Sequence, residues 1–179
     1  EKVKIAQRQW IGRSEGTKIR FVILNKVKDL STTRDSSAAP QNDKIAIEVF
    51  TTRADTLYGA TFLVLAPEHP IVVSLLNSKL KTQNSKLTEI REYVEKTKKR
   101  TERERMIDEK EKTGVFTGLY AINPLNQEKI PIWIADYALM GYGTGALFGD
   151  AHDERDVKFA KKYNISLKVT VITGDKEKD

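Results

Sequence analysis

The amino-acid sequence predicts a β-rich α+β fold, in which a barrel-like β core carries helices on its outside, as a single domain over residues 1–179. Short apolar runs with strand-like alternation recur along the chain and are separated by polar or glycine-containing turns. Only a few segments show helical spacing. A chain of 179 residues with 39% hydrophobic composition is long enough to bury one sizeable core and is near the usual size of one domain.

Strands are predicted wherever apolar residues alternate or form a short run. A pair of strands is expected within residues 4–24, and single strands at residues 45–49, 61–65, 130–134 and 168–172. Residues 26–43 are predicted to be a loop, because they are rich in Ser, Thr, Asp, Asn, Ala and Pro. The polar segment 51–56 therefore lies between two buried elements, a placement that suits a site.

Helices are predicted in three places. Pro70 opens one over residues 70–76, since its missing N–H costs nothing at the first helical position. Residues 87–112 begin with helical apolar spacing and then become almost wholly charged, which predicts an amphipathic helix that runs into a solvated helical arm. Residues 153–163 form the third, with Asn164 as its stop. One face of this helix carries Val157, Ala160 and Tyr163.

Composition excludes several kinds of site. Without cysteine there is no disulfide, thiol nucleophile or thiolate metal site, and two distant histidines, His69 and His152, make a poor metal centre, so we predict no metal. The G-x-x-x-x-G-K-[ST], G-x-S-x-G and H-E-x-x-H signatures are absent from the sequence. No apolar stretch approaches the ~18 residues of a transmembrane helix, and no secretory signal opens the chain. We expect a cytoplasmic protein with no membrane partner.

The charge is mildly basic. Thirty-one Lys and Arg against 25 Asp and Glu give a formal net charge of +6, which favours a polyanion such as RNA through counterion release. Much of the excess lies at residues 96–100 and their charged sequel, and at the tail 175–179. A solvent-facing helix surface and a frayed end explain these two runs at least as well as RNA binding does.

Two polar clusters are dense enough to form a site. Residues 51–56 place three hydroxyls, a guanidinium and a carboxylate directly after an apolar strand, although a strand-ending turn with a helix cap has the same pattern. The second cluster runs over residues 142–146 and, after a short apolar link, residues 152–156. Its glycines permit close backbone approach to a ligand. Asp153 is equally a helix cap, and Asp156 is equally a first-turn carboxylate favoured by the helix dipole.

These segments, in this order, resemble the editing domain (connective peptide 1, CP1) of bacterial or organellar leucyl-tRNA synthetases, over nearly the whole chain. The residues that carry the resemblance are 10–16 (WIGRSEG), 51–59 (TTRADTLYG), 64–70 (VLAPEHP), 117–124 (TGLYAINP), 142–146 (YGTGA) and 151–156 (AHDERD). The related isoleucyl and valyl domains usually carry Trp where this chain has Asp55, which favours the leucyl branch. The chain also begins without Met, so we expect a piece of a longer synthetase, with residues 1–15 and 165–179 near the junctions.

The resemblance implies post-transfer editing, the hydrolysis of the ester between tRNA(Leu) and Ile, Val, Met or a similar amino acid. One methylene yields only about 1–3 kcal/mol of discrimination, and a second, hydrolytic site is the double-sieve solution. The implied partners are the 3′-terminal aminoacyl-adenosine of tRNA(Leu) and the synthetase body in cis, in a monomer. No cofactor is implied for the domain. ATP would be used elsewhere in the parent enzyme, since the HIGH-type and KMSKS-type sequences are absent here.

The resemblance also implies residue roles. Asp156 should pair with the α-ammonium of the aminoacyl group by charge-assisted hydrogen bonds. Thr56 should line the side-chain pocket and block leucine, and Tyr142 should shape the adenosine or amino-acid pocket. The implied catalytic residues are Asp156, Thr51 and Thr52, and the implied substrate-binding residues are Thr56, Arg53, Tyr142, Gly143, Thr144, Asp153 and His152.

Two departures from the family pattern keep alternatives open. Ala54 replaces a typical Pro, and the link over residues 147–151 is one residue shorter than usual and lacks its Pro. Asp150 adds a negative charge in that link. An RNA-binding insertion that has lost hydrolysis is one alternative, and a valyl or isoleucyl editing domain is the other. An organelle is the alternative location.

Overall fold

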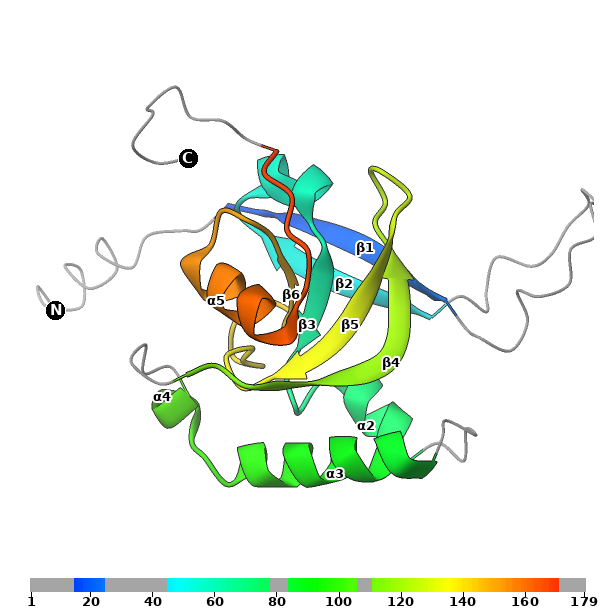
Figure 1. Ribbon diagram of the computed structural model, residues 1–179, viewed down its shortest axis with the longest axis vertical. Coiled ribbons are helices and arrows are strands. Elements are labelled where there is room, and N and C mark those ends of the chain that lie inside the picture. Colours follow the sequence, from blue (N-terminus) through cyan, green and yellow to red (C-terminus); the bar gives the residue numbers. More distant parts are fainter. Residues whose placement is uncertain (1–14, 25–44, 78–83, 106–110, 171–179) are drawn as a thin grey trace, which may run out of the picture.

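The computed structural model describes residues 15–24, 45–77, 84–105 and 111–170, which form one curved six-stranded sheet with helices around it (Figure 1). The sheet order is β2-β1-β4-β5-β3-β6. All neighbours are antiparallel except β3 and β5, which run parallel. The strands are β1 (Thr17–Leu24), β2 (Ala46–Thr51), β3 (Phe62–Leu65), β4 (Gly114–Ile122), β5 (Lys129–Ala135) and β6 (Ala146–Gly149).

The sheet curls toward a barrel but does not close. Its two edge strands, β2 and β6, approach each other, with Cα atoms within 8 Å, yet the described residues form no hydrogen-bonded ladder between them. The predicted barrel-like core with peripheral helices is therefore confirmed as a mixed, open sheet. The seam between β2 and β6 is the feature that positions the site.

Five helical segments surround the sheet: η1 (Ala54–Gly59, a 3-10 helix), α2 (Pro70–Asn77), α3 (Asn84–Lys98), α4 (Glu102–Arg105) and α5 (Glu154–Tyr163). Figure 1 shows α2 and α3 on the side of the sheet away from α5. No helix in the described ranges is both long and apolar enough to cross a membrane.

The core has two parts, one on each face of β3. Leu63 and Leu65 belong to the larger cluster, which also holds Ile90 of α3, whereas Phe62 and Val64 belong to the smaller cluster under α5. All four residues of β3 are buried, because both faces of the strand are covered. This is why its sequence is a continuous apolar run and does not alternate.

Most of the predicted elements are confirmed, namely the strands near residues 17–24, 45–49, 61–65 and 130–134 and the helix at residues 70–76. The first strand of the expected N-terminal pair and the loop 26–43 lie outside the described residues. The predicted strand at residues 168–172 is wrong for the part that the structure describes, since residues 168–170 form no strand. β4 and β6 were not expected.

The single helix over residues 87–112 is also wrong, because the segment holds two helices, α3 and α4. Thr101 accepts from the amide of Glu104 (3.3 Å), whose carboxylate accepts from the Thr101 amide (2.8 Å). This reciprocal cap starts a new helix. Nor is α4 wholly solvated, since buried Arg105 pairs with Glu68 at 2.9 Å. The basic residues at 96–100 are exposed, as expected.

Helix α5 begins and ends as predicted. Asp153 is its N-cap and accepts from the Arg155 amide at 2.8 Å, and Asn164 is its left-handed C-cap with φ 53°. The buried face differs from the expected one, because Asp156, Phe159 and Ala160 are buried while Val157 is only half-buried. Burying this face turns the Asp156 side chain away from solvent.

Candidate active site

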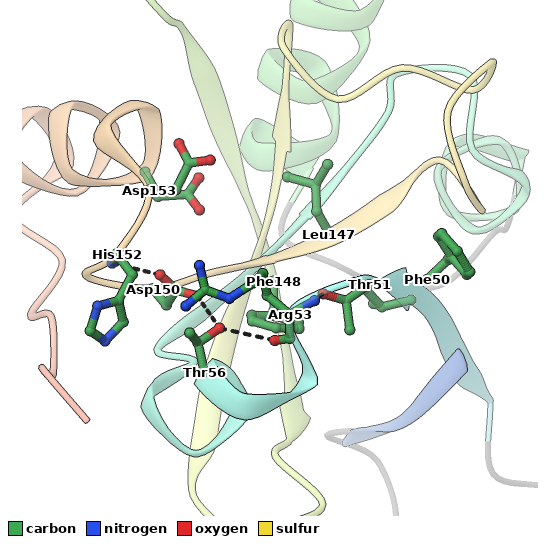
Figure 2. Close-up of a pocket in the computed structure, with 11 residues that line it drawn as sticks. Phe50, Thr51, Arg53, Thr56, Leu147, Phe148, Asp150, His152 and Asp153 are labelled. Carbon is green, nitrogen blue, oxygen red and sulfur yellow. Dashed lines mark hydrogen bonds between the residues drawn. The ribbon is translucent and has the colours of Figure 1, made fainter. Parts of the chain in front are cut away.

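A pocket of about 170 Å³ opens at the seam between β2 and β6 (Figure 2). Four segments build its wall: the end of β2, the turn into η1, strand β6, and the loop from β6 into α5. The lining residues are Val49, Phe50, Thr51, Arg53, Thr56, Leu147, Phe148, Asp150, His152, Asp153 and Asp156. The wall thus combines an apolar part from the two edge strands with three carboxylates.

Thr56 lies in η1 and is almost completely buried. Its hydroxyl donates to Asp150 Oδ2 at 2.6 Å and also lies 3.1 Å from the Arg53 carbonyl oxygen. Buried Asn123, which follows β4, holds η1 against the sheet, because its amide donates to the Leu57 carbonyl at 2.9 Å. The position of Thr56 is therefore set by the fold and not by the threonine-rich segment alone.

Asp156 is the buried carboxylate of the pocket, with 6% of its surface exposed. The Tyr137 hydroxyl donates to its Oδ1 at 3.0 Å. Burial raises the pKa of Asp156 to about 7, and the nearby negative charges of Asp153 and Asp150 act in the same direction. The hydrogen bond from Tyr137 and the charge of Arg155 oppose this rise without cancelling it.

Asp153 faces the pocket in a different electrostatic state. Burial alone would raise its pKa, but hydrogen bonds from Arg155 and the charge of that guanidinium outweigh burial and lower it. Arg155 Nη2 lies 2.9 Å from Asp153 Oδ2. The Asp153 carboxylate is thus held ionised at the N-terminus of α5, whereas the pKa of the buried Asp156 lies near neutrality.

The exposed rim comes from the turn after β2. The Thr51 hydroxyl oxygen accepts from the Arg53 amide at 2.9 Å, a local turn that ends the strand. Arg53 pairs with Asp55 at 3.1 Å, and both side chains are more than half exposed. The helix-cap interpretation of this segment is wrong, because no side chain caps η1 at its N-cap, Arg53.

Six of the ten predicted site residues line the pocket: Thr51, Arg53, Thr56, His152, Asp153 and Asp156. Thr52 and Tyr142 are exposed and do not line it, and Tyr142 has 64% of its surface accessible. Gly143 lies beside the pocket, since a Cβ there would meet Phe50 Cβ at 3.3 Å. Thr144 is half-buried, and its hydroxyl lies 3.5 Å from the Ala146 carbonyl.

Several lining residues were not expected from the sequence. Phe50, Leu147 and Phe148 supply the apolar wall, and Asp150 supplies the acceptor for Thr56. The shortened link over residues 147–151 had marked Asp150 as a departure from the family, which was the only signal. Its partner lies 94 positions away in the sequence, so no local pattern connects them.

Comparison with known proteins identifies the family. Residues 8–179 match the family model described as "Leucyl-tRNA synthetase, editing domain". The leucine–tRNA ligase of Roseiflexus castenholzii is 51% identical over 172 residues, which are 96% of this chain and 18% of that protein. The leucine–tRNA ligase subunit alpha of Aquifex aeolicus is 47% identical over 176 residues, 96% of this chain and 28% of that protein.

A solved structure agrees. The Agrobacterium radiobacter K84 agnB2 LeuRS, in a ternary complex with tRNA and LeuAMS, matches 97% of this chain and 18% of that chain, with TM-score 0.67 and 35% identity. The chain thus spans less than a third of the curated relatives it matches. The resemblance seen in the sequence is confirmed, and the valyl or isoleucyl alternative is not supported. The chain belongs to the leucyl-tRNA synthetase editing-domain family.

Proposed function

We propose that this chain hydrolyses the ester that joins a non-cognate amino acid to the 3′-terminal adenosine of tRNA(Leu), as the editing part of a leucine–tRNA ligase. The observation that carries the proposal is a small pocket in which a buried carboxylate, Asp156, faces an apolar wall. An aminoacyl group offers the matching chemistry, an α-ammonium beside an aliphatic side chain.

The size of the pocket supports this class of ligand. A pocket of about 170 Å³ with an apolar wall suits an aliphatic side chain. The adenosine would lie along the rim that Arg53 and the 142–144 loop provide. Exposed Tyr142 offers an aromatic face there.

The reaction makes modest demands on the protein, because an aminoacyl ester is already activated. Water attacks the ester carbonyl carbon, the bond to the ribose oxygen breaks, and that oxygen takes up a proton. Asp156 orients the substrate through its α-ammonium. Thr51 accepts a hydrogen bond from the Arg53 amide, so its hydroxyl hydrogen can be donated to the ester or to the attacking water.

We further propose that the domain acts without a metal or other cofactor, as part of a monomeric, cytoplasmic synthetase whose body binds the rest of the tRNA. ATP would be consumed elsewhere in that enzyme. The mildly basic charge of +6 agrees with an RNA partner.

The decisive experiment is to time the loss of each ester from Ile-tRNA(Leu) and Leu-tRNA(Leu). The wild-type chain should deacylate the first and spare the second. Asp156→Ala should lose about 100-fold or more of the Ile-tRNA(Leu) activity, as expected when a charged anchor of the substrate is removed, while its circular dichroism stays that of a folded domain. Folded Asp156→Ala with full activity would refute the role of Asp156. Wild-type protein that binds tRNA(Leu) and hydrolyses neither ester would instead favour an RNA-binding insertion.

A further inference from the structure

Asp150 and Thr56 form the shortest side-chain hydrogen bond that the structure gives inside the pocket, 2.6 Å between Oδ2 and Oγ1 (Figure 2). Both residues are buried, with exposed fractions of 7% and 1%. Both also line the pocket. Asp150 directly follows β6, and Thr56 lies in η1, so the contact joins two segments that are far apart in the sequence.

The carboxylate is itself held in place before it holds Thr56. Asp150 Oδ1 accepts from the backbone amide of His152 at 2.7 Å, which ties the carboxylate to its own loop. Its second oxygen, Oδ2, then faces η1 across the seam. Asp150 Oδ2 lies 2.6 Å from the Thr56 hydroxyl and the Arg53 carbonyl oxygen lies 3.1 Å from it, so the single hydroxyl hydrogen goes to Asp150.

Fixing the hydroxyl also fixes the methyl group. The two substituents share one Cβ, and threonine occupies staggered rotamers about χ1. A Thr56 side chain that rotates by one well would move its methyl to another part of the wall. In a pocket of about 170 Å³, the position of one methyl decides which aliphatic side chain fits.

We propose that Asp150 is a positioning residue that holds Thr56 in one rotamer and so sets which amino acids the pocket admits. The inference rests on the proposed editing function for its consequence, but not for the contact itself. Asp150 acts through Thr56 and makes no contact with the ester.

Two substitutions separate positioning from charge. Asp150→Asn removes the charge but keeps a hydrogen bond to Thr56. Its amide oxygen can accept from the His152 amide, and its NH₂ can donate to the Thr56 hydroxyl, whose own hydrogen then goes to the Arg53 carbonyl. Asp150→Ala removes the hydrogen bond to Thr56 as well as the charge. If Asp150 instead acted as a second charge for the α-ammonium, both variants would fail alike.

The first readout is the ratio of deacylation rates for Leu-tRNA(Leu) and Ile-tRNA(Leu). Asp150→Ala should raise this ratio by about tenfold, the lower end for a lost hydrogen bond to a charged group. Asp150→Asn should stay within about twofold of wild type. Thr56→Ala removes the block itself and should give the largest rise. In a Thr56→Val background, Asp150→Ala should change the ratio no further, since the group through which it acts is gone.

The second readout does not depend on activity. Scalar couplings of the Thr56 side chain, measured by NMR on the full chain, should report one χ1 rotamer in wild type and Asp150→Asn, and rotamer averaging in Asp150→Ala. The matched control is Asp136→Ala, which deletes another buried aspartate bonded to a threonine hydroxyl, Thr113 at 2.7 Å, outside the pocket wall. It should leave both the ratio and the Thr56 rotamer unchanged.

The outcomes distinguish this inference from the function on which it rests. If wild type hydrolyses neither ester while the Thr56 rotamer is averaged in Asp150→Ala and single in wild type and Asp150→Asn, the editing function is refuted. The positioning of Thr56 by Asp150 is then still supported. If wild type edits selectively but Asp150→Ala keeps the rotamer and the ratio, the inference is wrong. Equal loss of selectivity in Asp150→Asn and Asp150→Ala would overturn it in favour of charge.

Discussion

At the scale of single residues, Asp156 combines two demands that conflict. It is buried in the pocket wall, and this burial raises its pKa to about 7, yet an α-ammonium is bound best by an ionised carboxylate. The Tyr137 hydroxyl reduces the conflict by donating to it at 3.0 Å. Burial, with Asp156 next to it, raises the pKa of Tyr137 well above its ordinary value, so this residue remains a donor. A site that trades stability for binding is the expected result.

The first prediction concerns the stability cost of Asp156. Its folded pKa lies above its ordinary value of 3.8, so the folded state holds the proton more tightly, and this contribution to stability is present below about pH 4 and lost as pH rises to about 7. At about pH 8 the free energy of unfolding, measured by urea melts, should therefore be higher for Asp156→Asn than for wild type, by up to about 4 kcal/mol. The difference should shrink toward about pH 4. A difference that does not vary with pH would contradict this account.

At the scale of elements, helix α5 brings the site's carboxylates together through its own capping. Asp153 caps the first turn and points at the pocket, and Asp156 follows on the buried face of the same turn. A carboxylate at this end also interacts favourably with the helix dipole. From the sequence alone, a helix cap and a site residue are two alternatives for Asp153. In the structure Asp153 is both the N-cap of α5 and a residue of the pocket wall.

A prediction for this element separates the cap from the charge. Asp153→Ala should lower the free energy of unfolding by about 1 kcal/mol, since the Arg155 amide loses its acceptor. Asp153→Ser keeps a capping oxygen and loses only the exposed ion pair with Arg155, so it should cost less than Asp153→Ala. Urea melts near neutral pH measure both variants. Equal losses in the two would mean that the ion pair, and not the cap, stabilises the start of α5.

Which elements could be predicted follows from how regular their patterns are. Strands with clear alternation, such as β5, and helices with cap signals, such as α5, are visible in the sequence. β4 is not, because Gly118, at φ 77°, interrupts it where its pairing with β5 shifts between Phe116 and Tyr120. β6 has only four residues, and its apolar run looks like a link.

The candidate site divides in the same way. The polar residues of the two clusters carry local signals, and six of the predicted ten line one pocket. The apolar wall does not, since Phe50 and Phe148 look like ordinary strand residues. The contact between Thr56 and Asp150 depends on the sheet order that brings β6 near β2, and a sequence without an alignment does not contain that order.

At the scale of the whole molecule, the site occupies the one seam that the described strands leave unpaired. Its segments come from residues 49–56 and 147–156, at nearly opposite ends of the described chain, while β1, β4, β5 and β3 form the continuous sheet between them. An open edge normally exposes unpaired backbone groups to other chains. Here the two edges face each other across the pocket, whose wall consists of their apolar side chains and the three carboxylates.

The arrangement predicts that stability and selectivity are separable. Helix α3 packs on the side of the sheet away from α5, where Ile90 is fully buried in the larger core cluster (Figure 1). Ile90→Ala should lower the free energy of unfolding by about 2–5 kcal/mol, because a large buried side chain leaves a cavity. At a temperature where the variant is still folded, its ratio of Ile-tRNA(Leu) to Leu-tRNA(Leu) deacylation should stay within about twofold of wild type, because Ile90 does not line the pocket.

Glu89→Ala is the matched control for this prediction, since Glu89 is exposed on the same helix and its loss should change stability by no more than about 0.5 kcal/mol. Urea melts and timed deacylation of both esters supply the two measurements. A selectivity that falls in Ile90→Ala but not in Glu89→Ala would show that the packing of α3 against the core and the shape of the pocket are coupled. The seam would then be shaped by packing across the whole sheet, and anchoring within the pocket wall would not suffice to explain which amino acids it admits.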